Sequence, residues 1–169
     1  ASVSFLSQLF TKPSFWIIII LSCLITGLNI GIYNMIPHYF SNTSLASQKN
    51  IHTYMILART IGIFATLVSG IIMDRFGLKK AISTGLVLCG MFTICISFFS
   101  MHFAFFAFCL ESIVAVCIYP MVHVAILRFA PKEKSASMVS ISSSVGFIYG
   151  SGIQPQLLGI FEHFNMYSF

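Results

Sequence analysis

Two ionisable side chains stand inside long apolar segments, where a charge is unexpected. Arg59 interrupts the apolar residues 51–73, and Glu111 interrupts the apolar residues 103–129. A charge at the centre of a membrane-spanning helix costs about 3 kcal/mol or more, so such a residue is a functional candidate. If both segments are helices, each side chain lies about 12 Å from the same side of the membrane, because a helix rises about 1.5 Å per residue.

The chemistry that these two residues could perform is ion binding. We predict that Arg59 and Glu111 face a common cavity and can pair, with Arg59 attracting an anionic solute and Glu111 responding to protonation. A guanidinium suits this role because it is always charged and presents five N–H donors. The alternative interpretation is a permanent ion pair that only holds two helices together, and the residues themselves leave both interpretations open.

Other polar side chains in the apolar segments could assist. His123 could exchange a coupling proton, because imidazole titrates near neutral pH, although packing or an interfacial position explains most histidines of this kind. Hydrogen bonds to a solute could come from Asn29, Tyr33, Tyr119 and Gln154. Such side chains also join helices to one another. The sequence has no Ser/His/Asp set, metal-ligand spacing or Gly-rich phosphate loop, so it predicts neither an enzyme nor a metal or cofactor site.

The composition predicts that helices in a lipid bilayer position these residues. The chain is 57% hydrophobic and 8% charged, whereas a soluble domain is about 25% charged. The net charge of +5 could suggest a nucleic-acid partner. However, the charges lie in short loops between apolar segments, which favours a membrane and excludes nucleic acid. We therefore expect an all-α polytopic membrane protein.

Five membrane spans account for the apolar segments, since about 20 residues suffice to cross the hydrocarbon core. The predicted spans are 14–40, 51–73, 81–99, 103–129 and 136–160, between a lead-in at 1–13 and a tail at 161–169. The break before the fourth span rests on Ser100, Met101 and His102, because 81–110 is too long for one crossing. The five cysteines all lie in these segments and are interpreted as packing residues.

Small and polar residues recur at helical spacing in the spans. Ser22, Thr26, Asn29 and Tyr33 form one polar stripe on the first span. Gly27 and Gly31 lie on another face, and Ser142, Gly146 and Gly150 form a ridge on the fifth span; small residues of this kind let neighbouring helices approach closely. The third span lacks a polar stripe, so we expect much of its surface to face lipid.

Positive charges predict the orientation. Five crossings place seven of the nine Lys and Arg residues on one side: Lys12, Arg75, Lys79, Lys80, Arg128, Lys132 and Lys134. The opposite side carries Lys49 alone. Because basic loops stay in the cytoplasm, we predict a plasma membrane protein, in a bacterium the inner membrane, with these loops cytoplasmic.

The loop after the second span carries a recognisable pattern. Its sequence, Gly-Ile-Ile-Met-Asp-Arg-Phe-Gly-Leu-Lys-Lys, runs from Gly70 to Lys80. It resembles the signature loop of the major facilitator superfamily, Gly-x-x-x-Asp-Arg-x-Gly-Arg-Arg/Lys-Arg/Lys. The matching positions are Gly70, Asp74, Arg75, Gly77, Lys79 and Lys80, whereas Met73 and Leu78 depart from the pattern. Gly77 suits a tight turn because it adopts positive φ at low cost.

The resemblance implies an architecture. Members of that superfamily have twelve spans in two six-span halves, each with the loop after its second span. Five spans would then be one half without its last helix, with the missing half as a partner. The lead-in resembles the entry to the seventh span, which favours the C-terminal half; the N-terminal half is the alternative. Since the chain opens with Ala1 and shows no signal peptide, we expect it to belong to a longer protein.

The resemblance also implies a function. The first, second, fourth and fifth helices of each half line a central cavity, and Asp74, Arg75 and Lys80 would act as a gate latch. We therefore expect secondary active transport of a small polar or anionic metabolite by alternating access, with a proton as the candidate coupling ion. The alternatives are an exporter of drugs or other hydrophobic compounds and a multi-span scaffold that transports nothing.

Overall fold

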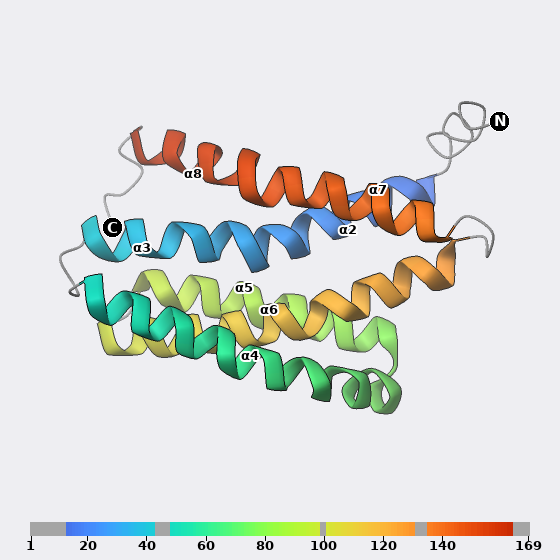
Figure 1. Ribbon diagram of the computed structural model, residues 1–169, viewed down its shortest axis with the longest axis horizontal. Helices are drawn as coiled ribbons and strands as arrows, with labels where there is room; N and C mark the ends of the chain where they lie inside the picture. The colour runs from blue at the N-terminus through green and yellow to red at the C-terminus, as the bar shows by residue number, and fades with distance from the viewer. Residues whose placement is uncertain (1–12, 43–47, 99–100, 131–134, 164–169) are drawn as a thin grey trace.

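The computed structural model describes residues 13–42, 48–98, 101–130 and 135–163, and these residues contain helices and no strand (Figure 1). In chain order the elements are α2 (Pro13–Thr26), η1 (Gly27–Ile32), α3 (Tyr33–Asn42), α4 (Gln48–Phe76), α5 (Leu78–Phe98), α6 (Met101–Phe129), α7 (Ser135–Ile148), η3 (Tyr149–Ile153) and α8 (Gln154–His163). The two η elements are π-helical turns that continue their neighbouring α-helices. The prediction of an all-α protein is confirmed.

Four helices in the described part of the chain are long and apolar enough to cross a membrane. They cover Phe15–His38, Ile51–Phe76, Leu78–Ile96 and Phe103–Phe129, in agreement with the first four predicted spans. The fifth predicted span corresponds to the α7–η3–α8 rod, which is not among the four. The serines of α7 and the glutamines that begin α8 make this rod more polar, and its crossing stays a prediction.

The helix boundaries differ from the predicted ones in informative ways. The break before the fourth span was predicted at Ser100, Met101 and His102. In the structure α5 ends at Phe98 and α6 already begins at Met101, and residues 99–100 lie outside the described residues. In contrast, α5 begins at Leu78 rather than at residue 81, because Lys79 and Lys80 continue the helix beyond its apolar part. Long cationic side chains permit this extension, since their charged ends can reach water while their stems cover apolar surface.

Gly77 alone separates α4 from α5. Its φ angle is +82°, a conformation that costs about 1–2 kcal/mol for a residue with a Cβ. The Gly77 N–H donates to the Met73 carbonyl at 3.0 Å, and the Gly77 carbonyl accepts from the Ala81 N–H at 3.0 Å. These two hydrogen bonds pair one backbone group of α4 and one of α5 with Gly77. The tight turn expected at Gly77 is present.

The helices pack around α6 in two groups. One group joins α6 to α4 and α5, and the other pairs the α2–η1–α3 rod with the α7–η3–α8 rod along its length (Figure 1). Core residues of α6 such as Ile118, Val122 and Ile126 face α2, α5 and α7. Towards the other end, Phe105 of α6 stacks on Phe40 of α3 with ring centroids 4.3 Å apart. Two apolar clusters therefore hold α6 against both groups.

Successive rods run in opposite directions. The start of α2, the α4–α5 turn, the end of α6 and the start of α7 lie at one end of the bundle. The end of α3, the start of α4, the end of α5 and the start of α6 lie at the other end (Figure 1). The first end carries Arg75, Lys79, Lys80 and Arg128, all exposed. The predicted clustering of basic residues at one end holds for these four; Lys12, Lys132 and Lys134 lie outside the described residues.

Glycines bring the two rods into backbone contact. A Cβ placed on Gly150 would lie 2.7 Å from the Thr26 carbonyl oxygen, and one on Gly146 would lie 2.8 Å from Thr26 Oγ1 and 3.0 Å from the Ser22 carbonyl oxygen. Ser142, one turn earlier on α7, is fully buried. The predicted ridge of Ser142, Gly146 and Gly150 is therefore the surface on which α7 and η3 cross α2.

Candidate functional site

Arg59 projects from α4 towards η1, where it meets two other predicted site residues. Its Nη1 donates to Asn29 Oδ1 at 2.7 Å and its Nη2 donates to the Asn29 carbonyl oxygen at 2.6 Å. The guanidinium carbon lies 4.0 Å from the centroid of the Tyr33 ring, a cation–π distance. Tyr33 in turn donates its hydroxyl to the Met55 carbonyl at 3.3 Å. Arg59, Asn29 and Tyr33 thus form one half-buried cluster, the arginine cluster.

A π-helical turn makes this arrangement possible. Asn29 lies in η1, where the wider π turn departs from regular α-helical pairing and presents the Asn29 carbonyl to a donor from another helix. Such turns occur frequently at functional sites. The sequence did not predict η1 or η3, because no residue pattern reports a π turn. The nearest signal was the pair of glycines that flank Asn29.

Glu111 lies on α6 in the interior of the bundle and is 1% exposed. Its Oε1 atom has no hydrogen-bond partner. Its backbone carbonyl accepts a long bond from the Cys89 thiol of α5 at 3.9 Å. Arg59 and Glu111 attract each other electrostatically, but these two described residues do not form an ion pair. Both terminal nitrogens of Arg59 are bonded to Asn29 instead, so the anticipated pairing is absent from this conformation.

The buried Oε1 atom of Glu111, which has no partner, leads to a test of the role of this residue. We expect Glu111→Gln to melt at the same temperature as the wild type or higher, because a neutral amide avoids burying an unpaired charge. Glu111→Ala is the control, and its cavity should lower stability by about 2 kcal/mol or more. The measurement is thermal unfolding in detergent, followed with a dye that reacts with the five free cysteines. A markedly less stable Glu111→Gln would show that the carboxylate makes a structural ionic contact.

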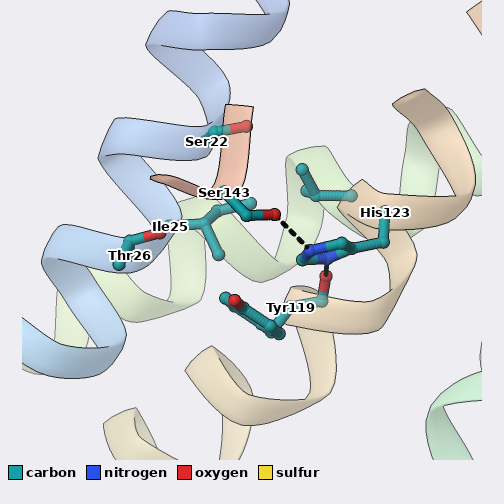
Figure 2. Close-up of a pocket in the computed structure, with 7 residues that line it drawn as sticks. Ser22, Ile25, Thr26, Tyr119, His123 and Ser143 are labelled. Atoms are coloured by element: carbon teal, nitrogen blue, oxygen red, sulfur yellow. Dashed lines mark hydrogen bonds between the residues drawn. The ribbon is translucent and has the colours of Figure 1, made fainter. Parts of the chain in front are cut away.

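A second cluster forms around His123 on α6. One ring nitrogen, Nδ1, lies 2.9 Å from the Tyr119 carbonyl oxygen, and the other, Nε2, lies 3.1 Å from Ser143 Oγ of α7. The Tyr119 and His123 rings are 4.6 Å apart. These residues border a small hollow between α2, α6 and α7, lined by Ser22, Ile25, Thr26, Tyr119, Val122, His123 and Ser143 (Figure 2). The predicted residues Tyr119 and His123 therefore belong to a site separate from the arginine cluster.

Gln154 joins neither cluster. It begins α8 and packs its side chain against Gly27 and Gly31 of η1, where a Cβ on either glycine would collide with the Gln154 amide. Its Oε1 atom is buried without a hydrogen-bond partner. Gly27 and Gly31 each lie two residues from Asn29, and residues two apart in a helix do not share a face. Gln154 therefore contacts a different face of η1 from the one that Arg59 contacts.

A comparison with protein families identifies the family to which the chain belongs. The family model of the major facilitator superfamily matches residues 1–155. The chain belongs to the major facilitator superfamily. No curated protein and no solved structure matches the chain. Members of this superfamily are membrane transporters rather than enzymes, so the helices described here are those of a transporter.

Membership of the superfamily explains the loop at Gly70 to Lys80. Asp74, Arg75, Lys79 and Lys80 are all exposed at the end of the bundle. The Arg75 guanidinium carbon lies 6.0 Å from the Phe76 ring centroid, and no ion pair forms between these loop residues. Their part in a gate latch stays a prediction, because a latch would require contacts with helix ends, and no such contact is seen among the described residues.

Sequence reasoning missed one member of the His123 cluster. Ser143 shares a hydrogen bond with His123. The sequence does not single it out, because Ser143 stands in a run of three serines and any of the three could face the interior. Ser142 is fully buried, Ser143 is half-buried and Ser144 is exposed. The packing of α7 against α2 and α6 determines which of the three serines contacts His123.

Proposed function

We propose that this superfamily member is a secondary transporter that moves a small anionic metabolite by alternating access. The observation that carries the proposal is the arginine cluster, in which Asn29 and Tyr33 orient the guanidinium of Arg59. The two hydrogen bonds to Asn29 use two of its five N–H groups. The remaining N–H groups suit a carboxylate or phosphate, which a guanidinium binds in a bidentate manner.

A purely structural role explains the arginine less well. A neutral amide or hydroxyl could hold η1 against α4 through the Asn29 oxygens without the cost of placing a charge within a membrane span. The Tyr33 ring and Glu111 interact with the positive charge of Arg59, but neither occupies the N–H groups that an anion would bind. Attraction of a solute anion therefore explains why residue 59 is an arginine. A role in holding two helices together explains only why a hydrogen-bond donor is needed at this position.

Glu111 supplies a means of coupling transport to protons. An ionised Glu111 competes with the solute for the positive charge of Arg59, because the two side chains attract each other. A protonated Glu111 leaves that charge to the solute. The proton and the anion then bind together, which corresponds to symport. The basic end of the bundle faces the cytoplasm in this proposal, by the positive-inside rule.

The test is a thermal-shift panel on the full-length protein in detergent. Small carboxylates and phosphate esters are compared with neutral polyols and with hydrophobic cations at equal ionic strength. A ligand at about 100 times its Kd stabilises the folded state by about 2.7 kcal/mol, and we expect this only from anionic solutes. Stabilisation by hydrophobic cations alone would instead favour an exporter of such compounds and overturn the proposal.

A further inference from the structure

The hydrogen bonds of His123 determine which ring nitrogen carries the hydrogen of its neutral form. The Tyr119 carbonyl oxygen can only accept, and it lies 2.9 Å from Nδ1, so Nδ1 must be the N–H donor. Nε2 of the neutral ring is then an acceptor, and the Ser143 hydroxyl donates to it at 3.1 Å. This leaves one lone pair, on Nε2, that can take a second proton.

The hollow beside this lone pair fits one water molecule. Its volume is about 10 Å³, close to the smallest space that holds a water. Ser22 faces it from α2, is 6% exposed, and its Oγ atom has no hydrogen-bond partner. Thr26, which is 4% exposed, lines the same wall (Figure 2). A buried hydroxyl without a partner next to a space of this size, with the Thr26, Tyr119 and Ser143 side chains on its other walls, can hold an internal water.

Among the described residues, none that contacts His123 carries a fixed negative charge that would bind a proton permanently. Of the two helices that face it across the hollow, α2 has one titratable side chain, Cys23, and α7 has none. On α6, the Tyr119 ring lies tilted against the imidazole. Cys117 is half-buried and Arg128 is exposed, and Glu111 lies twelve residues away, about 18 Å along the helix. The charged residues of α4 and α5 at this end of the bundle are Asp74, Arg75, Lys79 and Lys80, all exposed. A proton on His123 would therefore be held by hydroxyl groups and remain exchangeable.

We propose that the hollow between α2, α6 and α7 is a proton-binding site in which a water molecule delivers a proton to His123 Nε2. The Nε2 lone pair takes the proton from a protonated water, which remains as neutral water. Ser143 Oγ changes from donor to acceptor, and its hydrogen turns into the hollow towards the water and Ser22 Oγ. Protonation thus reverses a hydrogen bond between α6 and α7 and adds a water-mediated link from α7 to α2.

This inference rests on the proposed function in one respect, the use of the bound proton in transport. Proton binding by His123 itself does not depend on it. Anion binding at Arg59 and proton binding at His123 involve different side chains, so either can fail without the other. If the solute panel fails while His123 titrates, the proton site stands without the anion proposal. If anions bind but His123 stays neutral, the anion proposal stands alone.

The experiment is nitrogen NMR of histidine-labelled, full-length protein in lipid vesicles from about pH 5 to pH 8, the range in which histidines exchange protons. The resonances of His123 are assigned by their loss in His123→Gln. We expect a neutral ring with its hydrogen on Nδ1 at high pH and a doubly protonated ring at low pH. A neutral ring with its hydrogen on Nε2, or a ring that stays neutral throughout, would overturn the proposal.

Three variants sharpen this result. Ser143→Ala should shift the Nε2 resonance while leaving the hydrogen on Nδ1, because the Tyr119 carbonyl is unaffected. Ser22→Ala should move the midpoint of protonation to lower pH, since the water loses a partner. The control is His52→Gln, which removes an exposed histidine on α4 and should leave the His123 resonances unchanged. If His123→Gln fails to fold, the response to Ser143→Ala assigns the resonance, and the absence of a response to either serine variant contradicts the proposal.

Discussion

Replacing Arg59 by glutamine is expected to reduce uptake of the anionic solute by about a hundredfold. A charge-assisted hydrogen bond contributes about 1.5–3 kcal/mol, and each 1.4 kcal/mol corresponds to about a factor of ten in binding. Glutamine can still bond to the Asn29 oxygens that Arg59 contacts at 2.6 and 2.7 Å, so η1 and α4 should stay together. The measurement is uptake by the full-length protein in vesicles, with the solute that gives the largest thermal shift.

Two further variants distinguish the effect of the positive charge of Arg59 from the effect of its planar guanidinium geometry. Arg59→Lys keeps the charge but not the planar fork that spans both Asn29 oxygens, and should reduce uptake by about tenfold. Asn29→Ala keeps the charge and removes one of those oxygens, and should retain part of the activity. Normal uptake by Arg59→Gln, with a lowered melting temperature in Asn29→Ala, would mean that Arg59 is only a clamp between two helices.

Replacing Gly150 by leucine is expected to cost the protein its folded structure. A Cβ at this position would lie 2.7 Å from the carbonyl oxygen and 2.8 Å from the carbonyl carbon of Thr26. These are backbone atoms, so the clash is relieved only if η3 moves away from α2. That movement would open the contact between the two rods and separate Ser143 from α2. Alanine, which adds the Cβ alone, should destabilise by about 1–3 kcal/mol.

The chain offers a matched control two residues away. Gly152 lies in the same π-helical turn, and a Cβ there would meet nothing within 4 Å. We expect Gly152→Leu and Gly152→Ala to express and melt like the wild type. Size-exclusion profiles and thiol-dye melting curves of the four variants make the comparison. Equal losses at both positions would show that this turn cannot tolerate side chains in general and that the crossing at Thr26 is not the cause.

Most of the architecture could be predicted from local sequence because lipid imposes a simple rule. Backbone groups in a bilayer must pair within the segment, so an apolar run of sufficient length is a helix wherever it occurs. That rule predicted four segments that the structure forms as helices long and apolar enough to cross a membrane, with separate helices ending at Phe98 and beginning at Met101. It is weaker for the α7–η3–α8 rod, whose serines and glutamines signal packing against other helices rather than contact with lipid.

The candidate site could be predicted only in part. Arg59, Glu111 and His123 stand out because ionisable groups are rare within spans, and that inference needs no neighbours. Their partners depend on contacts across 20 to 30 residues, such as Arg59 with Asn29 and His123 with Ser143. No spacing along the chain reports these contacts. Both interpretations of the sequence paired Arg59 with Glu111, whereas in this conformation Arg59 is bonded to Asn29.

By itself, therefore, the sequence determined that this protein is a helical membrane protein of the major facilitator superfamily, through its apolar runs and the loop at Asp74 and Arg75. The tertiary structure decided that Arg59 bonds to Asn29, that Glu111 lies apart from it, and that His123 opposes a water-sized hollow. The physical reason is that hydrophobicity acts on each segment separately, whereas hydrogen bonds between helices depend on rotation and depth. Those are set by backbone contacts such as Gly150 against Thr26.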